Sequence, residues 1–271
     1  MKDPIYSMKK EMLRRKYSLR TIDSYLFCLN KFFKATKKDP RHVGKRDVKK
    51  YLDDLSETNK AGSTMNIYLS ALRFFVQDVM HKDINLNIRY SRRPKTLPVV
   101  LTKEETKKLF DAVTNSKHKL MLELMYSAGL RVSELLNLRI RDFESNHGWV
   151  RRGKGNKDRP FIIAEKLKER IEDHIKENNI EDYLFIGWNG TKMSVSTVQE
   201  IVKKARKKAK IKKNVHPHTL RHSFATHLIE DGYKVTDVQP LLGHSSLQTT
   251  MKYVHIASPQ ILSVKSPFDN L

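Results

Sequence analysis

The spacing of apolar residues near the beginning of the chain constrains its fold more than any other sequence feature. One set recurs at steps of three and four, which places its members on a single helical face: Ile22, Tyr25, Leu26, Leu29, Phe32 and Phe33. The same spacing predicts a short helix around residues 48–55 and a longer one over 65–79. Residues 1–88 are therefore expected to form an all-helical domain.

The segment that follows, residues 89–98, has neither a helical nor an alternating pattern. It holds two prolines and four basic residues, and each proline biases its predecessor toward an extended backbone. We interpret this segment as a basic linker that runs along a polyanion. A second domain is expected over residues 99–271.

The second domain is predicted to be mainly helical with a small antiparallel sheet. Thr102 and Glu105 form a capping box that opens its first helix. The hydrophobic period changes over residues 148–153 and 159–163, which are typical of two short strands around a Gly-Lys-Gly-Asn-Lys turn. Helical patterning then returns over three segments: 165–176, 195–210 and 218–230.

The charge of the chain indicates its partners. Lys and Arg number 53 against 30 Asp and Glu, a formal net charge of +23, and a field of this sign attracts nucleic acid first and anionic membrane surfaces second. The single cysteine, Cys28, excludes an internal disulfide and a cysteine-rich zinc site. No apolar stretch approaches the roughly 18–20 residues that a bilayer span needs, and no apolar signal segment opens the chain. We expect a cytoplasmic, nucleic-acid-binding protein with no membrane partner.

Two of five short motifs in the second domain present a basic side chain near a glycine. Arg131 follows a break at Gly129, where a helix N-terminus would put backbone N–H groups beside its guanidinium, and Glu134 lies one turn later to orient it. Lys154 stands between two glycines at the tip of the predicted hairpin, from which it can reach into a groove. Taken singly, Arg131 with Glu134 is more typical of a surface ion pair, and the turn at Lys154 is a weak signal because basic hairpin tips are commonly solvent-facing loops.

The third motif places a histidine and an arginine on one helical face. His218 and Arg221 are three residues apart; arginine offers bidentate charge to a phosphate, and histidine exchanges a proton near neutral pH. A metal site of His218, His222 and His227 is the competing interpretation. It is disfavoured because Arg221 would put positive charge against the metal. His222 and His227 are instead interpreted as residues that cap and pack the helix.

The last two motifs are a Leu-Gly-His turn at His244 and, nine residues downstream, Tyr253. A tyrosine in an apolar helix is more often a core residue than a nucleophile, so Tyr253 alone carries little weight. The joint order of the motifs carries more: Arg131 with Glu134, Lys154, His218 with Arg221, His244, then Tyr253. In this order they resemble the tyrosine recombinases of the phage integrase family, specifically the Xer-type recombinases that resolve chromosome dimers, archaeal ones included.

The resemblance implies both a fold and a chemistry. The helical N-terminal domain would be a core-binding domain that forms, with the catalytic domain, a C-shaped clamp around double-stranded DNA. Tyr253 would attack the scissile phosphate and leave a 3′-phosphotyrosine, which conserves the bond energy without ATP. The other roles are phosphate stabilisation by Arg131, Arg221 and His244, proton acceptance by His218, and proton donation to the 5′-oxygen by Lys154. No metal ion or cofactor is expected.

The resemblance also implies an assembly and leaves alternatives. Enzymes of this family work as tetramers on two DNA sites, so a homotetramer on a dif-like recombination site is expected. The alternatives are an integrase or excisionase of a mobile element, a type IB topoisomerase, and a basic DNA-binding protein without catalytic activity. The target sequence, a regulatory partner, and docking of the C-terminal tail on its own or a neighbouring subunit stay open.

Overall fold

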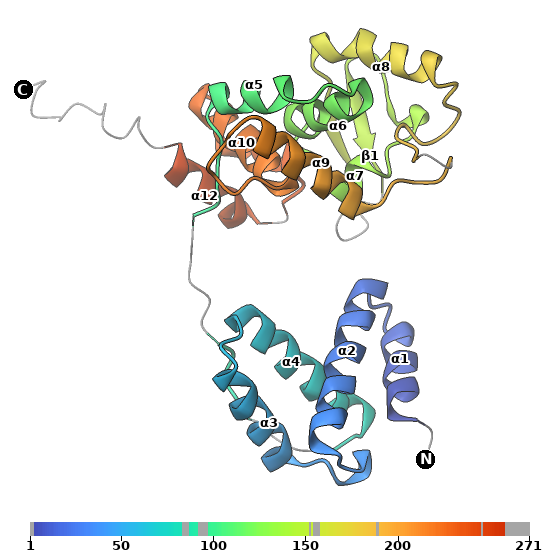
Figure 1. The fold of residues 1–271 in the computed structure, drawn as a ribbon, viewed down its shortest axis with the longest axis vertical. Coiled ribbons are helices and arrows are strands. Elements are labelled where there is room, and N and C mark those ends of the chain that lie inside the picture. The colour runs from blue at the N-terminus through green and yellow to red at the C-terminus, as the bar shows by residue number, and fades with distance from the viewer. Residues whose placement is uncertain are drawn as a thin grey trace, which may run out of the picture. The chain divides into compact units, whose positions relative to one another are not determined.

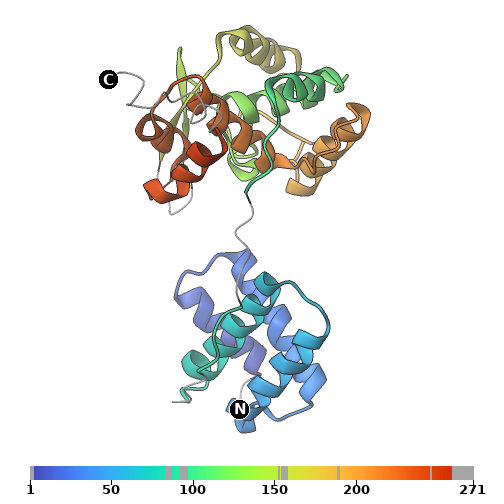
Figure 2. The same ribbon diagram turned by 90° about the vertical axis from the view of Figure 1, so that its left-hand side faces the viewer.

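The computed structural model describes residues 3–82, 87–91, 97–151, 153, 158–187, 190–244 and 246–257. The chain divides into two compact units, Met1–Lys95 and Thr96–Leu271, which are drawn in Figures 1 and 2. The centre of the predicted linker and the tail after residue 257 lie outside the described residues. No described helix is long and apolar enough to cross a membrane.

The described part of the first unit is built from helices. They are α1 (Pro4–Arg14), α2 (Leu19–Thr36), a 3-10 turn (Pro40–His42), α3 (Lys45–Glu57) and α4 (Gly62–Phe74), which a π-helical segment (Phe75–Val79) extends. Ser18 caps α2, because its hydroxyl accepts a hydrogen bond from the backbone N–H of Thr21 at 3.2 Å. The apolar spacing did not predict α1, which adds the fully buried Met8 and Met12 to the core.

Aromatic side chains fill the core of the first unit. Phe32 of α2 meets Tyr51 of α3 edge-on with ring centroids 5.1 Å apart, and Phe33 meets Phe75 at 5.4 Å. Edge-to-face contacts at such distances add to the stabilisation from burial of the rings. The predicted apolar faces thus form one contiguous core.

The second unit is mainly helical around a two-stranded sheet. Thr102 and Glu105 form the predicted capping box at the start of α5. Strands β1 (His147–Val150) and β2 (Arg159–Ile162) pair antiparallel, with Val150 opposite Arg159. The helices are α5 (Lys103–Asp111), α6 (Ser116–Ser127), α7 (Val132–Leu135), a 3-10 turn (Ile140–Asp142), α8 (Glu165–Glu177), α9 (Val195–Lys208), α10 (Pro217–Glu230), α11 (Val235–Leu242) and α12 (Leu247–Ile256). The predicted fold class, mainly α with a small antiparallel sheet, is confirmed.

Helix α10 is the central helix of the second unit. It packs against α6, α9, α11 and α12, and Figure 1 draws it among the helices of the second unit. Pro217 occupies its first turn, where the fixed φ of proline suits a helix start. Because α10 has neighbours on several sides, the polar residues that it carries can reach several elements at once.

Candidate active site

A buried carboxylate, Glu134, collects three guanidinium groups. Arg131 donates to it from its backbone N–H at 2.8 Å and from Nη1 at 2.5 Å. Arg159 Nη2 donates at 2.7 Å, and Arg221 Nη1 lies 3.5 Å from the same carboxylate. Burial alone would raise the pKa of Glu134, but the charges of Arg159, Arg131 and Arg221 hold that pKa below its ordinary value. The ionised carboxylate therefore holds three arginines in one place.

The positive charge of this cluster exceeds its negative charge. Arg221 is 2% exposed, and it donates from Nη1 to the carbonyl of Gly129 at 2.6 Å and from Nη2 to the carbonyl of Leu242. Burial, and next the charge of Arg131, lower the pKa of Arg221 to about 9. An anion placed beside Arg221 would favour its charged form. The cluster is thus arranged to bind an anion such as a phosphate.

Two glycines allow the chain to turn tightly around the cluster. Gly129 has a φ of +57°, and a Cβ at this position would lie 2.5 Å from the ring of Phe224. Gly243 also has a φ of +57°, and its Cβ would lie 2.6 Å from Cδ of Arg159. Both positions require glycine, for backbone conformation and for space. The Gly-Leu-Arg and Leu-Gly-His motifs therefore depend on side chains that lie far away in the sequence.

Tyr253, in α12, is 1% exposed and approaches two histidines. Its hydroxyl lies 2.9 Å from Nδ1 of His222. Its ring centroid lies 5.7 Å from that of His222 and 6.3 Å from that of His244, which it stacks on at 14°. Burial raises the pKa of Tyr253 to about 12, although Arg221 and Arg131 act in the opposite direction. The phenol is therefore neutral near pH 7 and needs a base before it can attack.

The histidines of α10 have different surroundings. His218 is exposed, and its ring stacks on that of His222 with centroids 6.3 Å apart. The contact of His222 with Tyr253 goes beyond the capping and packing role that the sequence suggested. His227 does have a packing role, because its Nε2 lies 2.9 Å from a backbone carbonyl oxygen and its Nδ1 lies 2.8 Å from the hydroxyl of Tyr126.

His244 reaches the site from the turn that follows α11. Its Nδ1 lies 2.9 Å from the hydroxyl of Thr250, which fixes the ring that stacks on Tyr253. Of the predicted site residues, Arg131, Glu134, Arg221, His244 and Tyr253 are brought together with His222, and His218 stands at the edge of this group. Lys154 lies outside the described residues.

Arg159 is the member of the cluster that sequence reasoning missed. It is 6% exposed, and besides Glu134 it donates to the backbone carbonyl of Leu241. In the sequence it is one basic residue at the start of a short strand. No pattern distinguishes it from an exposed basic residue of a hairpin, so its burial could come only from the tertiary structure.

The histidine metal site considered from the sequence does not assemble. Over the part of the chain that the structure describes, no three His, Cys, Asp or Glu side chains gather closely enough to hold a metal ion. His227 instead forms a hydrogen bond with Tyr126, and His222 forms one with Tyr253.

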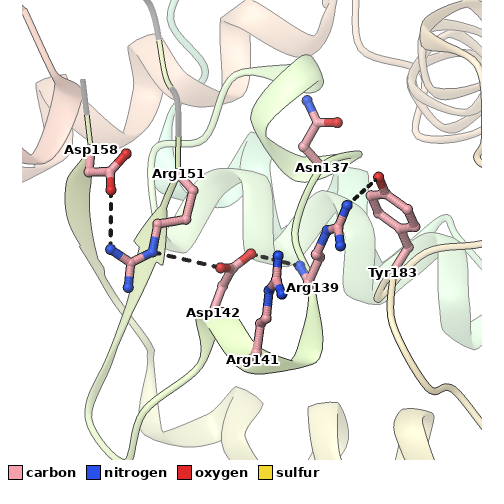
Figure 3. Close-up of a pocket in the computed structure, with 7 residues that line it drawn as sticks. All are labelled: Asn137, Arg139, Arg141, Asp142, Arg151, Asp158 and Tyr183. Carbon is pink, nitrogen blue, oxygen red and sulfur yellow. Dashed lines mark hydrogen bonds and ion pairs between the residues drawn. The ribbon is translucent and has the colours of Figure 1, made fainter. Parts of the chain in front are cut away.

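A second basic feature, which we call the arginine hollow, lies beside the ends of β1 and β2 that lead into the hairpin turn (Figure 3). Its volume is about 600 Å³, and it is lined by Asn137, Arg139, Arg141, Asp142, Arg151, Asp158 and Tyr183. Arg139 donates to the hydroxyl of Tyr183 at 2.8 Å, and Arg151 pairs with Asp158 at 3.1 Å. Arg141 is exposed and has no hydrogen bond or ion pair with another described residue.

Two family models match this chain. The model described as "Phage integrase family" matches residues 99–259. The model described as "Phage integrase, N-terminal SAM-like domain" matches residues 5–86. Together they span most of both units.

Proteins of similar sequence are named as recombinases. Tyrosine recombinase XerA of Pyrococcus horikoshii is 38% identical over 90% of this chain and 86% of its own length. Tyrosine recombinase XerD of Oceanobacillus iheyensis is 32% identical over 92% of each chain.

Solved structures share the fold. The crystal structure of XerA recombinase matches with 28% identity and a TM-score of 0.57 over 96% of this chain and 95% of that one. A XerH site-specific recombinase bound to its difH substrate matches with 22% identity and a TM-score of 0.75 over 95% and 84%. A lambda integrase dimer bound to a core site matches with 19% identity and a TM-score of 0.75 over 90% and 92%. The last two likenesses concern the fold alone.

Proposed function

This chain belongs to the phage integrase family and is a tyrosine recombinase, and from that premise we propose that it cuts and rejoins double-stranded DNA through a 3′-phosphotyrosine formed by Tyr253. One observation carries the proposal: the buried Tyr253 shares its site with a cluster of three arginines around a single carboxylate. A nucleophile and an excess of positive charge are what cleavage of a phosphodiester requires.

The proposed reaction conserves the number of phosphate ester bonds. The phenol oxygen of Tyr253 gives its proton to a histidine of α10 and forms a bond to phosphorus, and the bond from phosphorus to the 5′-oxygen breaks. Arg131, Arg221 and His244 stabilise the charge on the non-bridging oxygens. Lys154 gives the departing 5′-oxygen its proton. Attack by a 5′-hydroxyl on the phosphotyrosine reverses these steps and reseals the strand.

The electrostatics of the site support the roles of the two arginines. Arg131 and Arg221 are anchored to Glu134 and to backbone carbonyls before any substrate binds. Donors that are already in place need no rearrangement as charge develops, and each such group commonly contributes several kcal/mol to lowering a barrier. The pKa of Arg221 is lowered first by burial and then by the charge of Arg131. A bound phosphate would stabilise the charged guanidinium, which supports an anion-binding role for this site.

The binding of DNA would involve both units. We assign the core-binding role to residues 1–88, the catalytic role to residues 99–271, and to the basic segment 89–98 the path between them, so that the chain closes on the duplex as a clamp. The net charge of +23 supplies attraction to the phosphate backbone. The arginine hollow contributes a phosphate contact through Arg141, which extends from the 3-10 turn without a protein partner among the described residues (Figure 3).

For the biological substrate, we propose a dif-like site at which a homotetramer resolves chromosome dimers. The support is similarity to proteins named XerA and XerD. Integration or excision of a mobile element is the alternative, since the fold is shared with lambda integrase. Recombination between two copies of a dif-like palindrome found near the gene would favour resolution. Recombination only between the two ends of an adjacent element would favour the alternative.

The decisive test concerns the nucleophile. Tyr253→Phe removes only the hydroxyl, so it should leave DNA affinity intact and abolish the covalent protein–DNA adduct on a nicked suicide substrate. Tyr233→Phe, at a tyrosine that is 57% exposed, is the matched control and should form adduct like the unaltered protein. Adduct formation by the Tyr253 variant would overturn the assignment. Binding without any adduct by the unaltered protein would favour a non-catalytic DNA-binding protein.

A further inference from the structure

Two histidines on α10, His218 and His222, are positioned to serve the nucleophile, and the structure distinguishes them. His222 Nδ1 lies 2.9 Å from the hydroxyl of Tyr253. Among the described residues, this is the one hydrogen bond of that hydroxyl. His218 stacks on His222, with ring centroids 6.3 Å apart, and makes no hydrogen bond to Tyr253. The spacing of the third motif pointed to His218, but direct contact belongs to His222.

Both partners of this hydrogen bond are neutral in the free protein. Burial raises the pKa of Tyr253 to about 12. Burial, with the nearby positive charge of Lys252, lowers the pKa of His222 to about 3. A neutral imidazole has one ring nitrogen that donates and one that accepts. When the proton of His222 lies on Nε2, Nδ1 accepts the hydrogen bond of the phenol.

We propose that His222 is the catalytic residue that accepts the proton of Tyr253 during strand cleavage. This inference rests on the proposed function, in which Tyr253 is the nucleophile. As the phenol oxygen bonds to phosphorus, its proton passes to Nδ1 of His222. The bond from phosphorus to the 5′-oxygen breaks, and that oxygen takes its proton from a general acid, the role assigned above to Lys154. In resealing, His222 returns its proton to the tyrosine.

The charges around His222 explain how a weak base becomes effective. The groups that face it are Lys252 and Tyr253 on α12, His218 and Arg221 on α10, and His216 just before α10. Four of these disfavour a positive charge on His222, so the free protein keeps it neutral and ready to accept. A phosphodiester bound at Arg221 would offset that repulsion and raise the pKa of His222. Proton transfer is thereby coupled to the presence of substrate.

Two substitutions separate proton acceptance from hydrogen bonding. His222→Asn keeps a polar group near the place of Nδ1 but cannot take up a proton, whereas His222→Phe keeps a ring and loses both properties. Adduct formation on a suicide substrate is measured in single turnover from pH 6 to 10, together with DNA affinity and thermal unfolding. Both variants should bind DNA normally and cleave about 10²- to 10⁴-fold more slowly at neutral pH. Their rates should rise tenfold per pH unit as hydroxide replaces the base, where the unaltered protein levels off.

Two further histidine variants complete the test. His147→Asn, at a half-exposed histidine of β1 without contact to Tyr253 or His222, should cleave within about threefold of the unaltered protein and keep its pH profile. His218→Asn should keep the levelled profile even where its rate falls. Wild-type cleavage by His222→Asn would overturn the proposal, as would a tenfold-per-unit profile in His218→Asn but not in the His222 variants. Failure of the unaltered protein to form adduct would instead contradict the proposed function.

Discussion

Arg159 and Glu134 are 25 residues apart in the sequence, yet their buried ion pair joins strand β2 to the start of α7. Arg159 also contacts the turn at Gly243, where its side chain fills the space that a Cβ would need. One arginine thus links the strand that leaves the hairpin turn, the box that holds Arg131, and the turn that presents His244. At the scale of single residues, the site depends on a side chain outside the recognisable motifs.

Replacing Arg159 should therefore be costly. Arg159→Met leaves the Glu134 carboxylate buried with one fewer partner, and loss of one member of a buried pair typically costs about 3–5 kcal/mol of unfolding free energy. Arg159→Lys keeps the charge but not the forked guanidinium, so its unfolding free energy should lie between those of Arg159→Met and the unaltered protein. Urea unfolding measures the change. Lys203→Met, which removes an exposed ion pair with Glu200 on α9, is the control and should cost about 1 kcal/mol or less. Equal losses in the two methionine variants would contradict this account.

Among the elements, α10 packs against four other helices and carries two histidines, His222 and His227, that lie among these contacts. Burial lowers the pKa of His222 and His227 from the ordinary value near 6.5. A histidine whose pKa is lowered in the folded state binds a proton more readily when unfolded. Its contribution to stability is present above pH 6.5 and is lost as the pH falls toward the folded-state pKa, which for His222 is about 3.

The second unit should accordingly lose stability as the pH drops from 7.5 to 5. The slope is at most about 1.4 kcal/mol per pH unit for each suppressed histidine. Both tryptophans, Trp149 and Trp188, belong to this unit, so tryptophan fluorescence during denaturation reports on it. His222→Asn should flatten the dependence, and His42→Asn in the first unit should not. A pH dependence that is the same in all three proteins would refute the assignment to α10.

At the scale of the whole molecule, the net charge of +23 sets how binding responds to salt. Each phosphate contact releases counterions, so log affinity falls with log salt by about 0.9 per contact. The basic residues are spread along the chain, but only some of them will contact DNA phosphates. The slope of log affinity against log salt depends on the number of these contacts, so a change in that slope shows that a contact has been lost.

Arg141→Gln should weaken DNA binding at low salt and reduce the salt slope by about one. Lys166→Gln removes the same charge from an exposed position on α8 and should leave the slope unchanged. The measurement is a titration of a labelled duplex between low and physiological salt. Equal slopes of log affinity against log salt for the two variants would show that the arginine hollow does not contact DNA.

The C-terminal tail, residues 258–271, bears on how whole molecules assemble. Its apolar residues, Ile261, Leu262, Val264 and Phe268, are too few to fold alone and need a surface on which to be buried. If that surface is a neighbouring subunit, removing residues 258–271 should spare binding to one site and weaken assembly of two sites, seen by gel shift and by recombination. Unchanged assembly would exclude docking on a neighbour. Failure of the truncated chain to fold would favour a cap on its own domain.

Local patterns in the sequence were enough to predict much of the fold. The apolar face of α2 and the capping box of Thr102 with Glu105 depend on residues within one or two turns, and both are observed. The order of short motifs was enough to identify the family. Helix α1 was missed because it has few apolar residues. Met8 and Met12 are recognisable as core residues only once the helix packs against the other helices of the first unit.

The composition of the active site was decided by the tertiary structure. Spacing within α10 shows that His218 and Arg221 share a face, but it does not show which residue of α12, some 30 positions later, meets that helix. The contact of His222 with Tyr253 spans 31 residues, and the ion pair of Arg159 with Glu134 spans 25. Periodicity determines which side of an element is buried. Only the packing of elements against one another determines which side chains meet there, and so which histidine faces the nucleophile.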